Sequence, residues 1–380
     1  MPIRGERTIL SLAPVLRDGP VHGALWADAH THMGQNDPDG VKGTPAEVLR
    51  GLDAAGHARA LLFAMHEPDG YEAPNDAVLA ACAASGGRLV PLSRVDPKAP
   101  GAVEEARRCL AAGAVGIKLH PRSDAFGLPH PIVDELVALA AADRRIVLFH
   151  AGRGIPNLGA AVARLAREHP GARLVLAHAG ISDLGLLRDD AAELPNLLFD
   201  TSWWQIGDML DLLTSVPPGR VLYASDMPYG HGLQASFLLR RAARQAGWSE
   251  EQLAVAAGAQ LEAAIAGEEL HDLGPALGTA RVGPRSPRLE RVVGHTASAL
   301  QIAFRGGDAA EPLALARLGC QHQDGDEHAA LLAATDRVLA AAMEHRAGSP
   351  EDPRALAPAT LLAHVLCGTP AAGGPPTSLL

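Results

Sequence analysis

Short apolar runs alternate with longer amphipathic segments between residues 25 and 226. The apolar runs are rich in Leu, Val and Ile and are typical of buried strands, whereas the Ala- and Leu-rich segments between them have a helical period. A helix between two strands returns the chain so that the strands pair in parallel. The sequence therefore predicts eight strand–helix units, whose strands are the runs 25–30, 59–65, 88–95, 115–120, 145–150, 173–178, 196–202 and 220–226.

Eight such units within about 240 residues match the size of a (β/α)8 TIM barrel. An open, doubly wound sheet is the alternative, and it is less favoured because no Gly-x-Gly-x-x-Gly sequence follows the first run. The predicted fold class is thus α/β, with a barrel over residues 21–267 after an N-terminal segment, 1–20. A further helix is predicted for residues 249–267, which begin with the capping-box spacing of Ser249 and Gln252.

The sequence changes character after residue 267. Residues 268–287 contain several Gly and Pro without any period, which is typical of a linker. Helical periodicity returns in residues 288–367 and predicts a small helical module, whose Ala- and Leu-rich faces pack on the barrel or on another subunit of a homo-oligomer. The last residues, 368–380, read "GTPAAGGPPTSLL" and are expected to be a disordered tail.

Charge and composition exclude several classes of partner. The net charge is −10 and no Lys/Arg-rich run is present, which argues against nucleic acid because its phosphates need a basic surface. Pro14 and Arg17 interrupt the N-terminal apolar stretch, and no run approaches the roughly 18 residues that cross a membrane. We therefore expect a cytoplasmic protein that acts on a small molecule. The four cysteines lack CxxC spacing and are expected to be buried free thiols.

Polar side chains end several of the predicted strands. The first run leads into "DAHTH", and His30 and His32 are two residues apart, so both can point to the same side of a strand. This pair alone is a weak sign of a metal site. The carboxyl ends of barrel strands, however, meet at one face. His150, His178 and Asp226 end the fifth, sixth and eighth runs, and neutral imidazoles and carboxylates are metal ligands. Together these residues predict a metal site.

The motifs around these residues resemble the amidohydrolase superfamily, in its amidohydrolase-related branch of metal-dependent hydrolases and decarboxylases. The resemblance covers about residues 20–267. It is carried by "DAHTHMG", "GIKLHP", "FHAG", "AHAG" and "SDMPYG", and more weakly by "GAQLEAAIAG", in which Gln260 stands where the family usually has Asn.

The resemblance implies a role for each of the strand-end residues. His30, His32 and His150 would bind one divalent metal, zinc or else manganese. Asp226 would lie on or beside that metal as proton acceptor, and His178 would be the acid/base or polarising residue. A metal held by neutral imidazoles with an open position lowers the pKa of bound water to about 7, which agrees with these roles. Asp28, on the same strand face as His30, is expected to support the site as an acceptor.

Lys118, which ends the fourth predicted strand with His120, has three open interpretations. It is a carboxylated lysine bridging two metals, as in two-metal members of the superfamily; or it binds a substrate carboxylate or orients His120; or it forms a structural ion pair. Four further residues lie in loops after the strands. Arg122 and Arg153 are candidates to bind a substrate carboxylate, and the alternative is that they are solvated charges of the loops. Trp203 and Trp204 are candidates for an apolar wall of the site, and the alternative is that they pack in the core.

These features predict a metal-dependent hydrolase of a C–N or C–O bond, in an amide, lactam, lactone or ester, that uses metal-activated water on a small and anionic molecule. Two alternatives remain open. The same site would assist non-oxidative decarboxylation of an aromatic or enoic acid, which releases CO2 without incorporating water. A barrel without turnover would instead be a binding partner, although each of the expected ligands is present.

Overall fold

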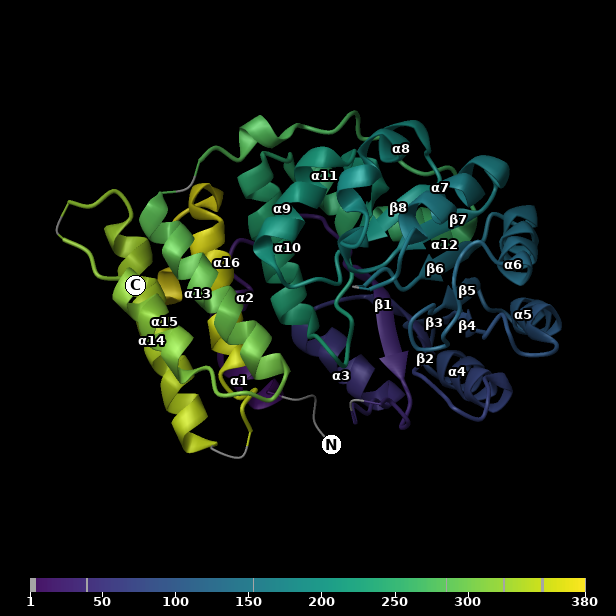
Figure 1. The fold of residues 1–380 in the computed structure, drawn as a ribbon, viewed down its shortest axis with the longest axis horizontal. Helices are drawn as coiled ribbons and strands as arrows, with labels where there is room; N and C mark the ends of the chain where they lie inside the picture. Colours follow the sequence, from purple (N-terminus) through teal and green to yellow (C-terminus); the bar gives the residue numbers. More distant parts are fainter. Residues whose placement is uncertain are drawn as a thin grey trace.

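The computed structural model describes residues 5–38, 40–152, 154–284, 286–323, 325–349 and 352–379. Its strands pair in parallel, as predicted (Figure 1). They are β1 Ala27–Met33, β2 Arg59–Ala64, β3 Leu89–Pro91, β4 Ser93–Arg94, β5 Gly116–Leu119, β6 Ile146–Phe149, β7 Arg173–Leu176, β8 Leu197–Asp200 and β9 Val221–Leu222.

The strands form two sheets that hydrogen bonds join at both edges. The third predicted strand is divided at Leu92, so that β3 pairs with β2 while β4 pairs with β5. At the other edge β1 lies beside the segment that contains β9. The Ala29 N–H donates to the Tyr223 carbonyl over 2.9 Å, and the His32 N–H donates to the Met227 carbonyl over 2.8 Å. The eight strand positions therefore form the predicted TIM barrel, with the carboxyl ends of the strands at one face.

Helices cover the outside of the strands. They are α3 Pro45–Ala55, α4 Glu72–Ala84, α5 Ala102–Ala111, α6 Pro131–Ala142, α7 Leu158–Glu168, α8 Arg188–Glu193, α9 Ile206–Ser215, α10 Gly232–Ala246, α11 Glu250–Ala254 and α12 Gln260–Ala266. Successive strand residues face opposite cores. Leu148 belongs to the cluster inside the barrel, whereas Val147 and Phe149 belong to the cluster beneath the helices. Burial on both faces explains why the strands are continuous apolar runs rather than alternating ones.

The helical segment after α10, which contains α11 and α12, closes the barrel at the amino ends of the strands. Ser249 and Gln252 form the predicted capping box at the start of α11. A Cβ at Gly258 would lie 1.7 Å from the Leu25 carbonyl oxygen, so only glycine lets this helix approach the start of β1. Gln260 is fully buried and its side-chain carbonyl accepts from the His271 N–H over 2.8 Å. Gln260 thus has a structural role.

Four C-terminal helices stand beside α9 and α10 (Figure 1). They are α13 Pro287–Phe304, α14 Ala310–Gly319, α15 Ala329–Gly348 and α16 Ala357–Gly368. Helix α16 packs on α13 and α15 and, toward the barrel, on α9 and α10. It also contacts α1, Glu6–Ser11, which precedes α2, Ala13–Leu16. Among the described residues, no helix has the length and apolar character needed to cross a membrane.

The chain beyond α16 lies against the barrel helix α10, which differs from the disorder expected for residues 368–380. Arg241 of α10 is buried and donates to the carbonyl oxygens of Thr369, over 2.8 Å, and Gly373, over 3.1 Å. A buried guanidinium requires acceptors, and this segment supplies them. The four cysteines are free and buried, as predicted.

Candidate metal centre

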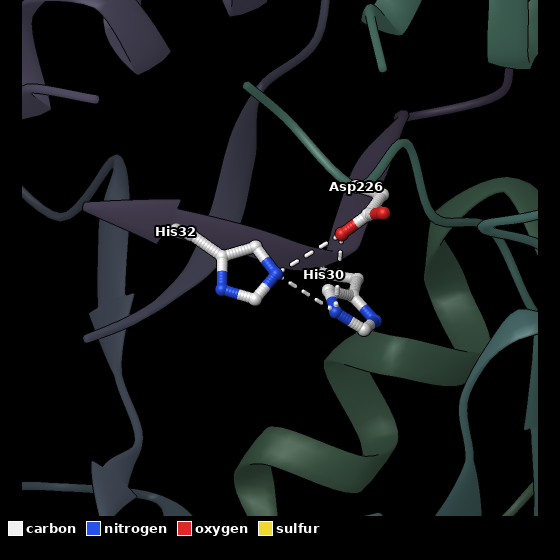
Figure 2. Close-up of side chains that lie close together, drawn as sticks. All are labelled: His30, His32 and Asp226. Carbon is white, nitrogen blue, oxygen red and sulfur yellow. Dashed lines mark hydrogen bonds and ion pairs between the residues drawn. The ribbon is translucent and has the colours of Figure 1, made fainter. Parts of the chain in front are cut away.

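Three predicted ligands converge at the carboxyl-terminal face of the barrel (Figure 2). His30 and His32 project from β1, and Asp226 lies in the turn that follows β9. The Nε2 atoms of the two histidines are 3.1 Å apart. Asp226 Oδ1 lies 3.0 Å from Nε2 of His32 and 3.4 Å from Nε2 of His30. Asp226 has a left-handed backbone (φ 59°), a conformation that is uncommon for residues other than glycine and concentrates at functional sites.

The three atoms fit a divalent cation. Ligand atoms about 2.0–2.1 Å from a tetrahedral zinc are separated from one another by about 3.3 Å, close to the spacing observed here. Burial lowers the pKa of His30 to about 3 and holds that of His32 well below its usual range, so both rings are neutral and can ligate. Burial, with the charge of Asp200, raises the pKa of Asp226 well above its ordinary value. A nearby cation would relieve that cost.

Asp200, at the end of β8, connects the cluster to its surroundings. Its Oδ2 is 2.7 Å from Nδ1 of His30, which must carry the proton because an ionised carboxylate only accepts. The Nε2 atom of His30 then carries no proton, and its lone pair is free to ligate on the side of His32 and Asp226. Burial alone would raise the pKa of Asp200, but the His30 ring with its hydrogen bond, the His178 ring and the hydrogen bond from the Ser202 hydroxyl hold it below its ordinary value. Such a carboxylate–histidine pair fixes the orientation of a metal-binding imidazole.

Asp28 holds strand β1 and the turn after β9 together through hydrogen bonds to their backbones. Its Oδ1 accepts from the backbone N–H groups of His30, over 3.1 Å, and Ser225, over 3.0 Å. Burial raises its pKa to about 7 despite these hydrogen bonds. Asp28 therefore joins the ligand strand to the turn that carries Asp226, as an acceptor rather than as a member of the three-atom cluster.

The other predicted histidines lie next to the cluster. Nδ1 of His178 is 2.9 Å from the Ser202 carbonyl oxygen, so Nδ1 carries the proton. Its Nε2 is 3.0 Å from Nδ1 of His150. The Nε2 atom of His150 has no hydrogen-bond partner among the described residues, and it lies against Gly152 rather than within the cluster. The His120 ring stacks on that of His150, with ring centroids 3.8 Å apart.

Lys118 is fully buried at the same face. Its Nζ has no hydrogen-bond partner within the described part of the chain and stands 4.9 Å from the centroid of the Phe63 ring. Burial lowers its pKa to about 7, a change that Asp200 and Asp226 oppose and that the charge of Arg94 reinforces. Lys118 thus brings to the region of the candidate ligands an amine that has no ion pair with any residue the structure describes.

The residues that were predicted to bind substrate differ in their position relative to the candidate ligands. Trp203 lies beside His178, with ring centroids 6.3 Å apart, and its indole N–H donates to Asp208 over 2.6 Å. Arg122 is exposed on the loop after β5. Its charge contributes to the low pKa of His150, after burial and the larger electrostatic effects of His178, Lys118 and His30. Arg153 lies outside the described residues.

Sequence reasoning missed two charged residues of this face. Asp200 ends strand β8, two residues before the end of the seventh predicted run, so a signal close to the one that identified Asp226 was present. Arg94 ends strand β4, one residue before the end of the third predicted run, and pairs in register with Lys118. Its guanidinium is buried and donates to both oxygens of Asp124, over 3.1 and 3.2 Å. Asp124 is 53 positions from Tyr71, whose hydroxyl also donates to it over 2.6 Å, so no local pattern reveals this network.

Solved structures with the same fold come from proteins of low sequence identity. IDCase from Metarhizium anisopliae is 14% identical, with a TM-score of 0.53 over 64% of this chain and 98% of that one. An amidohydrolase from Burkholderia multivorans is 17% identical, with a TM-score of 0.52 over 64% and 99%. The 5-carboxyvanillate decarboxylase of Sphingomonas paucimobilis is 14% identical, with a TM-score of 0.50 over 64% and 99%. At these identities the likeness concerns the fold.

Comparison with protein families supplies the sequence relationship. Residues 26–268 match the model of a family described as amidohydrolase. A comparison with curated proteins finds no match. The matched range begins just before β1 and ends after α12, so it includes every strand and the ligand cluster and leaves out helices α13–α16. Because it covers well over half of the sequence, the chain belongs to the amidohydrolase family.

Proposed function

We propose that this protein is a metal-dependent hydrolase that cleaves a C–N or C–O bond of a small carboxylate. One observation carries the proposal: Nε2 of His30, Nε2 of His32 and Oδ1 of Asp226 converge with separations of 3.0–3.4 Å. His30, His32 and Asp226 would hold one divalent ion, with zinc favoured by the two imidazoles. His150 is the candidate for a fourth ligand, because its ring is neutral and its Nε2 has no partner among the described residues.

The chain's own residues supply the proton transfers. A bound divalent metal lowers the pKa of a coordinated water to about 7 and so makes a nucleophile available at neutral pH. Asp226 accepts the proton of the attacking water, since its carboxylate lies at the cluster. The leaving group would receive the proton that Asp226 accepted, passed on through Nε2 of His178, while the Ser202 carbonyl holds Nδ1–H of His178 in place.

The charges around the cluster support an anionic substrate. Lys118 is a buried ammonium with no partner among the described residues, and a substrate carboxylate would supply one. Arg122 adds an exposed positive charge on the next loop. Trp203 offers an apolar surface beside His178 for the rest of the molecule. We infer that Lys118 binds the carboxylate in preference to bridging two metals, because only one group of three candidate ligands occurs in the described chain.

A second function, non-oxidative decarboxylation, is favoured by the same buried Lys118. As CO2 leaves, the negative charge of a substrate carboxylate passes to the carbon that held it, and the Lys118 ammonium beside that carbon would stabilise this charge and could supply the proton that replaces CO2. The similarly folded Sphingomonas protein is a 5-carboxyvanillate decarboxylase, which makes this chemistry a natural alternative. The two reactions differ in their products: hydrolysis incorporates oxygen from labelled water, whereas decarboxylation releases CO2 and leaves the label in solvent.

The proposal is tested first by elemental analysis of the purified protein. We expect about one equivalent of zinc or manganese per chain, and turnover of a panel of lactones, amides and aromatic acids that a chelator abolishes. Two equivalents would reinstate the bridging role of Lys118. A protein that stays free of metal after reconstitution, or whose turnover is indifferent to chelators, would contradict the proposal and favour the binding-partner alternative.

Asp200→Asn provides a graded test of the same site. The amide cannot accept strongly from His30 Nδ1, so we expect divalent metal affinity to fall about 10–100-fold. Competition with a fluorescent zinc chelator measures the change. Asp208→Asn is the matched control. Like Asp200, Asp208 accepts a hydrogen bond from a ring N–H, here that of Trp203, but it lies on α9, away from the ligands. Equal affinity of both variants would remove Asp200 from the metal centre.

A further inference from the structure

The C-terminal helices contact the segment that borders the candidate site. Residues 202–206 run from the loop after β8 to Ile206, the first residue of α9. Trp204 in this segment is half-buried, and its ring lies 5.6 Å from Phe304 of α13 and 5.9 Å from His364 of α16, measured between centroids. Two of the four C-terminal helices therefore meet the same indole.

His364 also binds the segment through the backbone. Its side chain is fully buried, and Nε2 accepts from the N–H of Ile206, the first residue of α9, over 3.3 Å. Because Nε2 accepts, the proton lies on Nδ1, which donates to Thr296 Oγ1 over 3.0 Å. Thr296 in turn donates to the Val292 carbonyl of α13 over 2.8 Å. His364 of α16 thus caps the amino end of α9, and α13 holds His364 in place through Thr296.

The close approach of α16 to this point is built into the sequence. A Cβ at Gly368, the last residue of α16, would lie 2.6 Å from Ile206 Cγ2 and 2.8 Å from Cγ1. Any larger residue would push the two helices apart. Gly368 and His364 are one helical turn apart, so both act on the start of α9.

The segment continues into the chemistry of the site. The Trp203 ring, 5.9 Å from that of Trp204, lies next to His178. The Ser202 carbonyl and hydroxyl oxygens are each 2.9 Å from Nδ1 of His178. The Ser202 N–H also donates to Asp200 over 3.0 Å. A displacement of the segment would therefore move both the surface of Trp203 and the hydrogen bond that fixes His178.

We propose that the helical module, α13–α16, positions the substrate-facing segment 202–206, with His364 and Trp204 as its positioning residues. The metal ligands lie on β1 and after β9, and the segment approaches them at Ser202, whose hydroxyl oxygen is 3.4 Å from Nδ1 of His30. This inference deepens the proposed function, because it assigns substrate selection to helices that lie outside the residues matched by the family model. Its test by ligand binding rests on the proposed function, whereas its test by hydrogen exchange does not. His364 is a positioning residue, since it acts through Ile206 and Trp204.

Hydrogen–deuterium exchange of the metal-free full chain tests the restraint directly. In His364→Leu we expect exchange within residues 202–206, and of the Ile206 amide above all, to be at least tenfold faster, with β1 unchanged. His364→Gln can accept from Ile206 and donate to Thr296, so it should restore exchange to within threefold. His345→Leu is the control, because His345 is an exposed histidine of α15. Phe304→Ala, at a partly exposed position, removes the second contact with less risk to folding.

The ligand-binding arm uses benzoate as the probe. In zinc-loaded protein we expect His364→Leu and Phe304→Ala to weaken benzoate binding about tenfold, by tryptophan fluorescence, with zinc content unchanged. Unaltered exchange in residues 202–206 in both variants, or equal acceleration across the whole barrel, would overturn the positioning role. Failure of the natural chain to bind zinc or benzoate would contradict the proposed function instead, and the exchange data would still decide the role of the module.

Discussion

Replacement of His30 and His32 together by alanine is expected to reduce bound metal from about one equivalent to less than a tenth. Two of the three convergent ligand atoms disappear, and Asp226 alone cannot hold a divalent ion against chelators. The loss in affinity should exceed the roughly 10–100-fold effect of changing a partner outside the ligand set. Elemental analysis after dialysis measures the content, and the catalytic activity should fall with it.

The control for this double variant is His22→Ala, which removes an exposed histidine shortly before β1. It should retain metal. Circular dichroism should show the same helix content in both proteins, since His30 and His32 lie on a strand, β1. Full metal content in the double variant would place the metal elsewhere and refute the assignment.

Lys118→Met is expected to stabilise the metal-free protein at pH 7 while impairing substrate binding. The folded-state pKa of about 7 lies well below the unfolded value of about 10.5, so between these values the unfolded chain binds more protons. Stability of the natural chain should therefore rise with pH from about 7 to 10.5. Methionine removes the cost of the buried amine, and we expect a gain of about 2–4 kcal/mol in the free energy of unfolding at pH 7.

Urea denaturation at several pH values between 7 and 10 measures this effect. The advantage of Lys118→Met should shrink as pH rises, because the unfolded lysine loses its proton. Lys98→Met is the matched control: its side chain is 46% exposed, and its substitution should change stability little at any pH. Equal stability of Lys118→Met and the natural chain at pH 7, or a gain that does not vary with pH, would mean that Lys118 has a partner in solution.

The fold was predictable because both faces of each strand are buried. That burial produces the continuous apolar runs that identified all eight strand positions. The break at Leu92 was not predictable, since it arises from pairing with β2 on one side and β5 on the other. The buried Asn75 of α4 was not predictable either, because its amide donates to the Arg94 carbonyl, 19 positions away, over 3.0 Å.

The part of the candidate site that lies at the ends of strands was predictable from the sequence. His30, His32 and Asp226 could be grouped because parallel strands end at one face. The position of His150 could not, because its distance from the cluster depends on a side-chain torsion and on its contact with His178. The contribution of the C-terminal helices was also hidden, since His364 and Ile206 are 158 positions apart and share no motif.

The seam between β1 and the turn after β9 has a consequence for biosynthesis. His32 and Asp226 are 194 positions apart, and the backbone bond from His32 to Met227 joins the same two segments. Contacts of such sequence separation form only after the intervening chain has been made and folded. A truncated or unfinished polypeptide that lacks the last strand therefore lacks the Asp226 carboxylate, the one ligand atom of the cluster that β1 does not supply. Under the proposed assignment, metal capture would report that the ring of strands is complete.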